Sequence, residues 1–255
     1  MSNHPRTSFS YAIGLAACVA ATLGAHSSFA FGLDEVYSPN VDYREIAFEY
    51  AHARSFDGDP AKNGAQVGEL TFEIGLTPRF VFAVSGEYEA EAGEDLHMTA
   101  HQVEGRCQLV ESGEYWLDAG LLLAYKFSKQ TDAPDEVEFK LLLQKDTGRF
   151  THTANIGFAQ SVGKFPQLTN EAGYSFLWNT RYRYDQTFQP GFEIQSDLGV
   201  GSQVGYLKQQ EHYIGPSVQG KLFGHLKYQA AYLFGMTDPA AQHAARLTLE
   251  YETHF

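Results

Sequence analysis

The chain has 255 residues, of which 44% are hydrophobic and 14% aromatic, and its 31 acidic residues outnumber its 18 basic residues to give a net charge of −13. So acidic a protein repels phosphate, which argues against a nucleic-acid-binding function. The length suffices for one or two domains.

Residues 1–30 have the features of a secretory signal peptide. Arg6 is their only Lys or Arg, no acidic residue occurs, and residues 11–24 form an apolar stretch too short to span a bilayer as a helix. Small residues at Ser28 and Ala30 predict cleavage after Ala30, with Ala25 as an alternative.

A second interpretation of the leader is open. Residues 15–18 (LAAC) resemble a lipoprotein cleavage box, which would place a lipid on Cys18. The apolar run continues past Cys18 and a full cleavage site follows, so the sequence favours cleavage after Ala30.

Residues 31–42 contain the breakers Pro39 and Asn40 and are predicted to form a periplasmic N-terminal segment. The rest of the chain, residues 43–255, has no apolar run near 18 residues and therefore no expected transmembrane helix. Cys107 is the only cysteine after the leader, so no disulfide can form within the mature chain. These features leave a soluble β-protein or a β-barrel.

Alternation of apolar and polar residues predicts twelve β-strands. Their predicted ranges are 43–51, 65–76, 80–90, 97–109, 114–127, 136–145, 149–162, 172–184, 188–200, 210–221, 225–234 and 243–255. Most are longer than the ~5–6 residues of a globular strand and match the ~9–11 residues that cross a bilayer at a tilt.

The connections between these strands alternate in length. Short turns are predicted at 77–79, 110–113, 146–148, 185–187 and 222–224. Longer loops, such as 52–64, 128–135 and 201–209, are predicted at the other end. An even strand count with short turns on one side and long loops on the other is typical of outer-membrane barrels, with both termini on the periplasmic, short-turn side. We therefore predict an all-β transmembrane antiparallel up-and-down barrel over residues 43–255.

The two faces of each predicted strand differ in polarity. In 172–184, Tyr174, Phe176 and Trp178 share one face, and Asn179, Arg181 and Arg183 share the other. In a barrel the apolar faces contact outer-membrane lipid and the polar faces line the lumen.

The last strand carries a further signal. Residues 244–255 alternate strictly and end on Phe255. This resembles the closing strand of bacterial outer-membrane barrels, whose last residue is typically Phe. The resemblance implies that Phe255 serves as a signal for the barrel-assembly machinery, which would bind the C-terminal strand.

Charged residues on the predicted lumen faces separate into two groups. The predicted acidic wall consists of Glu45, Glu49, Glu69, Glu73, Glu87, Glu89, Glu250 and Glu252. The predicted basic wall consists of Lys126, Lys140, Arg181, Arg183 and Lys227. Centring the first loop near residue 59 places Glu49 beside Glu69 and Glu45 beside Glu73. Centring the next turn on Pro78 places Glu69 beside Glu87.

Three interpretations of these charges are open. They form ion pairs that plug a narrow lumen, or they line a water-filled pore whose transverse field selects polar solutes. Third, the clustered carboxylates bind a hard cation. The first interpretation is the plainest.

No catalytic, cofactor or metal site is predicted. Outer-membrane phospholipase A resembles a twelve-strand barrel and carries catalytic His, Ser and Asn residues on its outer surface. The nearest approach here, His152-Thr153-Ala154-Asn155, lacks the serine. We therefore predict that the protein is not an enzyme.

Three stretches resemble a family of small proteobacterial outer-membrane proteins that are porin-like. They are 36–50 (VYSPNVDYREIAFEY), 111–123 with 135–143, and 232–238 with the final strand. The resemblance implies an outer-membrane location and a barrel fold, and it carries over no catalytic or ligand residue. The favoured function is a channel for small polar or charged solutes. The alternative is a plugged structural barrel that supports the envelope or docks a periplasmic partner.

Overall fold

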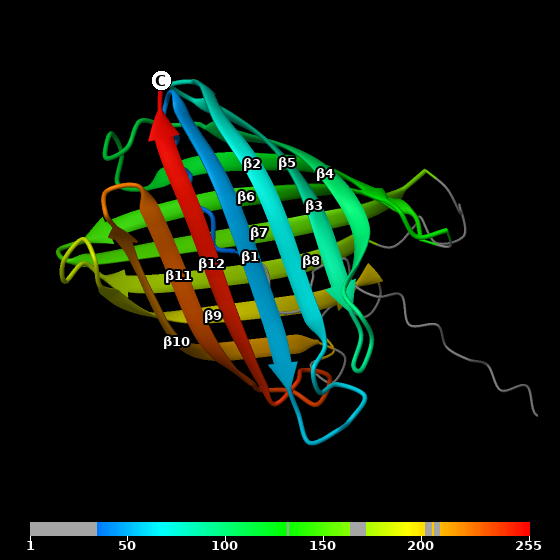
Figure 1. The fold of residues 1–255 in the computed structure, drawn as a ribbon. Helices are drawn as coiled ribbons and strands as arrows, with labels where there is room; N and C mark the ends of the chain where they lie inside the picture. Colours follow the sequence, from blue (N-terminus) through cyan, green and yellow to red (C-terminus); the bar gives the residue numbers. More distant parts are fainter. Residues whose placement is uncertain (1–34, 132, 164–171, 202–205, 207–209) are drawn as a thin grey trace, which may run out of the picture.

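The structure is a computed structural model that describes residues 35–131, 133–163, 172–201, 206 and 210–255. The predicted signal peptide, residues 1–30, lies outside the described residues. Twelve antiparallel strands close into one barrel, each pairing with its neighbours in sequence and β1 with β12 (Figure 1). The strands are β1 (Glu45–Phe56), β2 (Gln66–Thr77), β3 (Phe80–Ala90), β4 (His97–Gln108), β5 (Asp118–Ser128), β6 (Asp135–Thr147), β7 (Phe150–Val162), β8 (Ala172–Tyr182), β9 (Gln189–Val200), β10 (Glu211–Leu222), β11 (Leu226–Gly235) and β12 (His243–His254). The predicted all-β barrel of twelve strands is confirmed.

The closing seam is continuous from end to end. β1 and β12 pair in register from Glu45 opposite His254 to Phe56 opposite His243. Closure leaves no sheet edge, so backbone N–H and C=O groups find partners within the sheet, as a structure in hydrocarbon requires. Among the described residues, no helix is long and apolar enough to cross a membrane.

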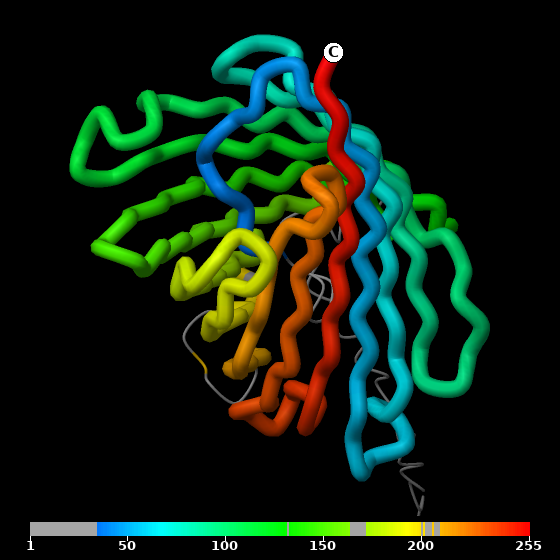
Figure 2. The backbone as a smooth tube through the Cα atoms, turned by 60° about the vertical axis from the view of Figure 1, so that its left-hand side comes forward, coloured from blue at the N-terminus to red at the C-terminus, as the bar shows by residue number. Residues whose placement is uncertain are grey.

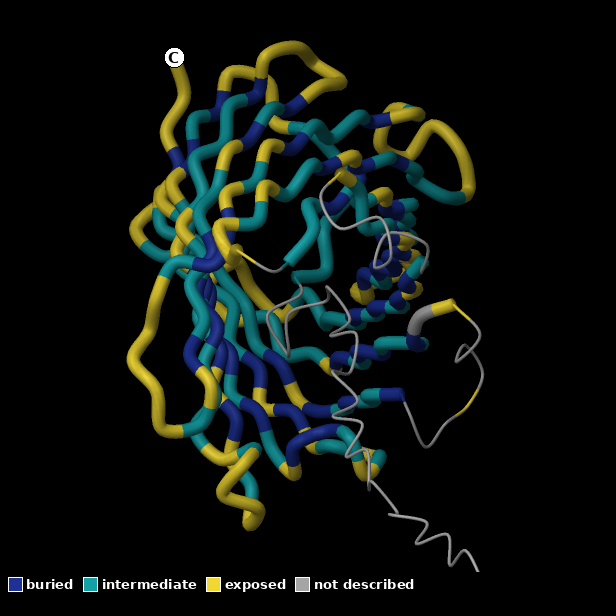
Figure 3. Tube along the Cα trace, turned by 90° about the vertical axis from the view of Figure 1, so that its right-hand side faces the viewer, coloured by how far each residue is buried: buried dark blue, intermediate teal, exposed yellow. Residues whose placement is uncertain are grey.

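Burial alternates along much of the sheet, as Figure 3 shows. On β1, Phe48 is 57% exposed and Tyr50 43%, whereas Ala51 and Ala53 are at most 3% exposed. The exposed row points away from the lumen and the buried row points into it. The outer surface is therefore apolar and aromatic, which matches a barrel surrounded by lipid.

Connection lengths differ between the two ends of the barrel. Near Phe255 the chain turns within residues 78–79, 148–149 and 223–225. Phe223 and Gly224 both have positive φ, which a turn this tight requires. The opposite end carries longer loops, including 57–65 and 236–242.

One predicted turn is wrong. The connection from β4 to β5 spans residues 109–117 instead of 110–113, because β5 starts at Asp118. A local turn replaces the strand pairing here: Glu114 N donates to Glu111 O at 3.0 Å, and Gly113 N donates to the Asp118 carboxylate at 2.8 Å. The connection exposes Tyr115 and Trp116, which the alternation had assigned to a strand.

β1 also extends further than predicted, to Phe56 instead of Ala51. The alternation continues through Ala53 and Ser55 on the buried face, with Arg54 and Phe56 on the exposed face. The first loop is therefore shorter than predicted, and the β1–β2 pairing is centred one residue later, which changes the register with β2.

Candidate functional site

The lumen contains a cavity of about 560 Å³. Its wall is formed by residues 35–42, by β1 to β4, and by β10 to β12, with additions from β6, β8 and β9. Eight acidic and four basic side chains line it: Glu35, Asp42, Glu45, Glu49, Glu69, Glu73, Glu104, Glu250, Arg106, Arg181, Lys221 and Lys227. Carboxylates therefore outnumber cationic groups two to one around this space.

The predicted acidic residues lie on β12, β1, β2 and β3, which are consecutive in the closed sheet. Five of the eight line the cavity, namely Glu45, Glu49, Glu69, Glu73 and Glu250. The remaining three, Glu87, Glu89 and Glu252, lie on the same strands outside its lining.

The predicted register is right for one pair and wrong for two. Glu69 lies opposite Glu87, as predicted. Glu49 lies opposite Thr71 instead of Glu69, and Glu73 lies opposite Ala47 instead of Glu45. The cause is the first loop, whose centre lies one residue later than predicted. A two-residue shift keeps every side chain on its face, so these carboxylates still point into the lumen.

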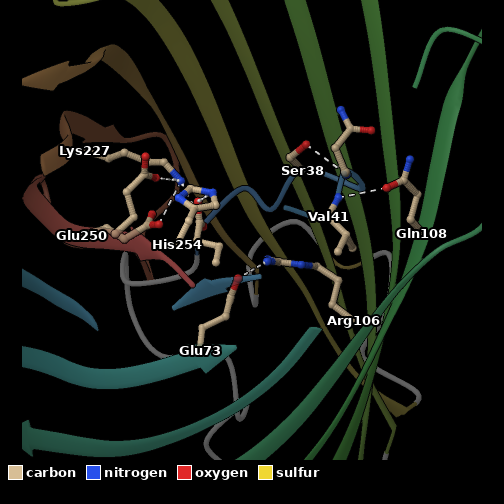
Figure 4. Close-up of polar contacts among 11 residues, drawn as sticks. Ser38, Val41, Glu73, Arg106, Gln108, Lys227, Glu250 and His254 are labelled. Carbon is tan, nitrogen blue, oxygen red and sulfur yellow. Dashed lines mark hydrogen bonds and ion pairs between the residues drawn. The ribbon is translucent and has the colours of Figure 1, made fainter. Parts of the chain in front are cut away.

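Two lysines neutralise the carboxylates nearest the short-turn end. The Lys227 ammonium lies 2.9 Å from Glu250 and 3.5 Å from Glu45, and it also contacts Glu252 (Figure 4). Lys221, which the sequence did not single out, also pairs with Glu252. The carboxylate oxygens of Glu45, Glu250 and Glu252 lie within 4.8 Å of one another, a spacing suited to a metal ion, and the Lys227 ammonium takes that place.

Three of the four other predicted basic residues also pair along the wall. Lys126 lies 2.8 Å from Glu87, and Lys140 lies 3.0 Å from Glu138. Arg183 lies 2.6 Å from Asp146 near the short-turn end. Arg181 lines the cavity. Lys126, Lys140 and Arg183 thus meet carboxylates on the same or nearby strands, whereas the sequence predicted that an acidic wall and a basic wall face each other across the lumen.

A buried ion pair closes part of the lumen on the β8 to β12 side. Arg246 Nη2 lies 2.8 Å from Glu193 Oε2, and both side chains are 0% exposed. Gln195 donates to the other Glu193 oxygen at 2.7 Å, and Asn179 lies 3.4 Å from Oε2. This pair was not predicted from the sequence. The alternation of polar and apolar residues places Arg246 on the polar face of the last strand. The same alternation along β9 places Glu193 on its polar face, and this was the available signal.

Residues 35–42, which we call the strap, run through the lumen. Figure 2 shows them in blue, leaving the start of β1 and curving back across the opening between the green and the orange and red strands. The sequence predicted a periplasmic segment over 31–42, and the described part of it, 35–42, differs by lying against the inner wall. Its polar backbone explains the position, because the lumen offers polar partners for it.

Two inward amide side chains hold the strap. Asn155 on β7 accepts from Tyr37 N at 2.7 Å and donates to Tyr37 O at 2.8 Å. Gln108 on β4 accepts from Val41 N at 3.0 Å (Figure 4). His152 faces outward and bonds Thr180, so His152 and Asn155 lie on opposite faces of β7 and share no site.

The Tyr37 ring is held between two cations. The Arg106 guanidinium and the Lys140 ammonium each lie 5.5 Å from the ring centroid, within cation–π range. The ring also packs against the buried cluster of Leu122, Ala124 and Leu142. Arg106 is held in turn by Glu73 at 2.6 Å (Figure 4).

The strap ends in a carboxyl group that packs against other carboxylates. Glu35 forms a hydrogen bond with Glu49, and Glu250 and Arg246 lie nearby. Burial, opposed in part by Arg246, raises the pKa of Glu35 from 4.5 to about 7. Two carboxyl groups in hydrogen-bond contact favour sharing one proton over ionising together.

No family model matches the chain, and no curated protein matches it in sequence. Solved structures match its fold. The KdgM porin has a TM-score of 0.55 at 10% identity, over 82% of this chain and 100% of the porin. An outer-membrane channel from Pseudomonas putida F1 has a TM-score of 0.60 at 11% identity, over 88% and 98%. The NanC porin has a TM-score of 0.56 at 8% identity, over 81% and 98%. At these identities the likeness is one of fold: this chain adopts the closed barrel architecture of porins and outer-membrane channels.

Proposed function

We propose that this protein is an outer-membrane channel for small polar or charged solutes, with a preference for cations. The observation that carries the proposal is the lumen cavity, whose lining holds twice as many carboxylates as cationic groups inside a barrel with an apolar exterior. Water-filled space lined by one excess charge concentrates counter-ions and excludes ions of the same sign. The porin-like fold supports this function and this location.

The charge balance also bears on which solutes pass. One solved structure of similar fold is a KdgM porin in complex with disordered oligogalacturonate, at 10% identity and a TM-score of 0.54. Galacturonate units carry carboxylates, which the acidic lining of this lumen would repel. We therefore expect this channel to favour cationic or neutral solutes over acidic ones.

The proposal also covers the orientation of the barrel in the membrane and its export. Short turns near Phe255 favour periplasmic termini. Cleavage after Ala30 and recognition of the C-terminal strand by the assembly machinery stay predictions. The reaction class is transport, and the proposal assigns no catalytic residue.

Single-channel recording in a planar bilayer tests this function. We expect discrete conductance steps and a reversal potential in a KCl gradient that reports cation preference. A second function, a plugged structural barrel, is favoured by the strap and by the buried Arg246–Glu193 pair, both of which fill lumen space. A well-folded barrel that stays electrically silent would support that second function and sink the first.

Replacing Glu49, Glu69 and Glu87 together with glutamine is expected to lower the cation-to-anion permeability ratio by about a factor of two or more, because three lumen carboxylates lose their charge. The reversal potential measures this ratio. The matched control changes three exposed loop carboxylates, Glu91, Glu94 and Glu114, to glutamine. An unchanged ratio in the lumen variant would rule out these carboxylates as the filter.

A further inference from the structure

We propose that the strap, residues 35–42, is a releasable constriction of the lumen: docked, it narrows the pore, and withdrawn, it opens the pore. The proposal adds gating to the proposed channel function. It stands on the way the barrel wall is shaped to receive the strap and on the strap being held by side-chain contacts instead of strand pairing.

Two inward glycines make room for the strap. A Cβ atom on Gly75 of β2 would lie 2.1 Å from the Asp42 carbonyl oxygen, which is impossible without moving the strap. A Cβ atom on Gly120 of β5 would lie 3.0 Å from Pro39 Cα and Cβ. A larger residue at Gly75 would push the strap off the wall, and one at Gly120 would require a small shift of Pro39. The seat is thus a property of the barrel wall itself.

The strap has fewer backbone hydrogen bonds to the wall than a strand has to its neighbours. Within the described residues, its backbone is bonded to the wall by the side chains of Asn155 and Gln108, whereas β1 is paired along its whole length with β12 and over most of it with β2. Segments held by few hydrogen bonds open locally at a small fraction of the global unfolding free energy. The strap can therefore leave while the barrel stays closed.

A pivot lies where the strap meets the barrel. Arg44 has a φ of 66°, a left-handed conformation that reverses the chain direction between the strap and β1. Arg44 N donates to Gly75 O at 3.0 Å, and Phe255 N donates to Arg44 O at 3.2 Å. Rotation before this anchored residue moves the strap and leaves the β1–β12 seam unchanged.

Withdrawal would also change the charge of the lumen. The docked Tyr37 ring covers the Arg106 and Lys140 cations, and the strap residues Glu35 and Asp42 add two carboxyl groups to the cavity lining. Release uncovers two cations and takes two acids out of the lining. The open pore is therefore expected to conduct more and to prefer cations less than the docked pore.

The carboxyl pair at Glu35 gives docking a pH dependence. Glu35 faces Glu49 on β1, Glu250 and Arg246 on β12, and Arg106 on β4. Its pKa of about 7 when docked exceeds the usual 4.5, so the docked strap binds a proton more tightly. Between pH 4.5 and 7 docking must weaken as pH rises, and then level off.

Thiol labelling of a cysteine beneath the strap, described in the next paragraph, measures docking. Repeating it from pH 5 to 8 tests this pH dependence. Glu35→Gln should remove the dependence and leave docking intact. A flat profile in the unaltered strap would show that Glu35 is not buried against Glu49 in the docked state.

Chemical labelling tests release directly and does not depend on conductance. Leu122 is 0% exposed and lies in the cluster beneath Tyr37, so a cysteine there is covered only while the strap is docked. In a Cys107→Ser background, Leu122→Cys should react slowly with a water-soluble thiol reagent. Adding Asn155→Ala and Gln108→Ala should speed the reaction at least tenfold. Thr71→Cys, which lines the cavity on β2, should react at one rate in both backgrounds.

A second variant controls for the possibility that the Asn155 and Gln108 substitutions alter the barrel itself. Tyr37→Ala alters the strap alone and should speed labelling at position 122 as well. Equal labelling rates at position 122 in all three backgrounds would overturn the proposal, since the cover would then not be the strap.

Locking provides the opposite test. Pro39→Cys with Gly120→Cys brings two Cβ atoms within about the 3.5–4.5 Å of a disulfide after a small shift. In the Cys107→Ser background the oxidised protein should show the lower conductance, and reduction should restore that of the unlocked channel. Conductance that ignores both locking and release would refute the gate. Silence in every variant, with labelling still accelerated by release, would refute the channel function and keep the releasable strap.

Discussion

Replacing Arg246 with alanine is expected to destabilise the folded barrel by about 3–5 kcal/mol, because it leaves the Glu193 carboxylate buried without its countercharge. Both side chains are 0% exposed, and their 2.8 Å contact joins β12 to β9 across two intervening strands. Gln195 still donates to Glu193 in the variant, but an amide hydrogen bond does not neutralise the charge.

The measurement is urea unfolding in lipid vesicles, followed by tryptophan fluorescence and by the heat-dependent gel mobility of a folded barrel. The matched control is Arg246→Met with Glu193→Gln, which removes both charges and keeps most of the volume. Its stability should return to within about 1 kcal/mol of the parent, since a buried pair is close to neutral against uncharged residues of similar size. A loss below about 1 kcal/mol in the single variant would mean that the two groups are solvated or apart.

Leu123→Arg is expected to destabilise the barrel by about 2–4 kcal/mol in a bilayer, since it places a cation on the lipid face near the midplane. Leu123 lies at the centre of β5, 58% exposed on the outer face, between Gly105 on β4 and Phe139 on β6. The side chain has no lumen partner within reach because it points away from the pore.

The control for that prediction is an arginine on the same strand and face but at a different depth in the membrane. Phe127→Arg lies near the long-loop end of β5 and is 46% exposed on the outer face. It should cost no more than about 1 kcal/mol, because an arginine near the interface reaches water and headgroups. Both values come from unfolding in vesicles. Equal costs at the two positions would argue that no hydrocarbon layer surrounds the middle of the barrel.

The strand faces could be predicted from the sequence because a period of two fixes which residues share a face, whatever the register. Glu49 and Glu73 therefore point into the lumen even though the predicted partner of each was wrong. Register depends on where a loop is centred, and the first loop offers three turn signals, Asp57-Gly58, Asp59-Pro60 and Asn63-Gly64, which leave its centre ambiguous. The boundary of β5 failed for a similar reason, since Tyr115 and Trp116 read as strand residues but lie in a turn.

The strap could not be predicted. Residues 35–42 have no periodicity, and their partners Gln108 and Asn155 lie 67 and 118 residues away in the chain. The local pairing of Lys126 with Glu87 was also beyond the sequence, because it depends on how far one side chain reaches across an intervening strand. The sequence did supply one clue, the inward glycines Gly75 and Gly120, whose meaning appears only when the strap is seen against them.

The proposed channel must be wet inside and surrounded by lipid outside, and residues 69–73 of β2 test this requirement most directly. Single nitroxide labels at each position, in a Cys107→Ser background, would be compared for collision with oxygen, which concentrates in lipid, and with a water-soluble nickel chelate. Glu69, Thr71 and Glu73 line the cavity, whereas Leu70 and Phe72 lie on the other face. We predict that nickel access dominates at 69, 71 and 73 and that oxygen access dominates at 70 and 72. Equal access along the strand, or the opposite alternation, would contradict the account.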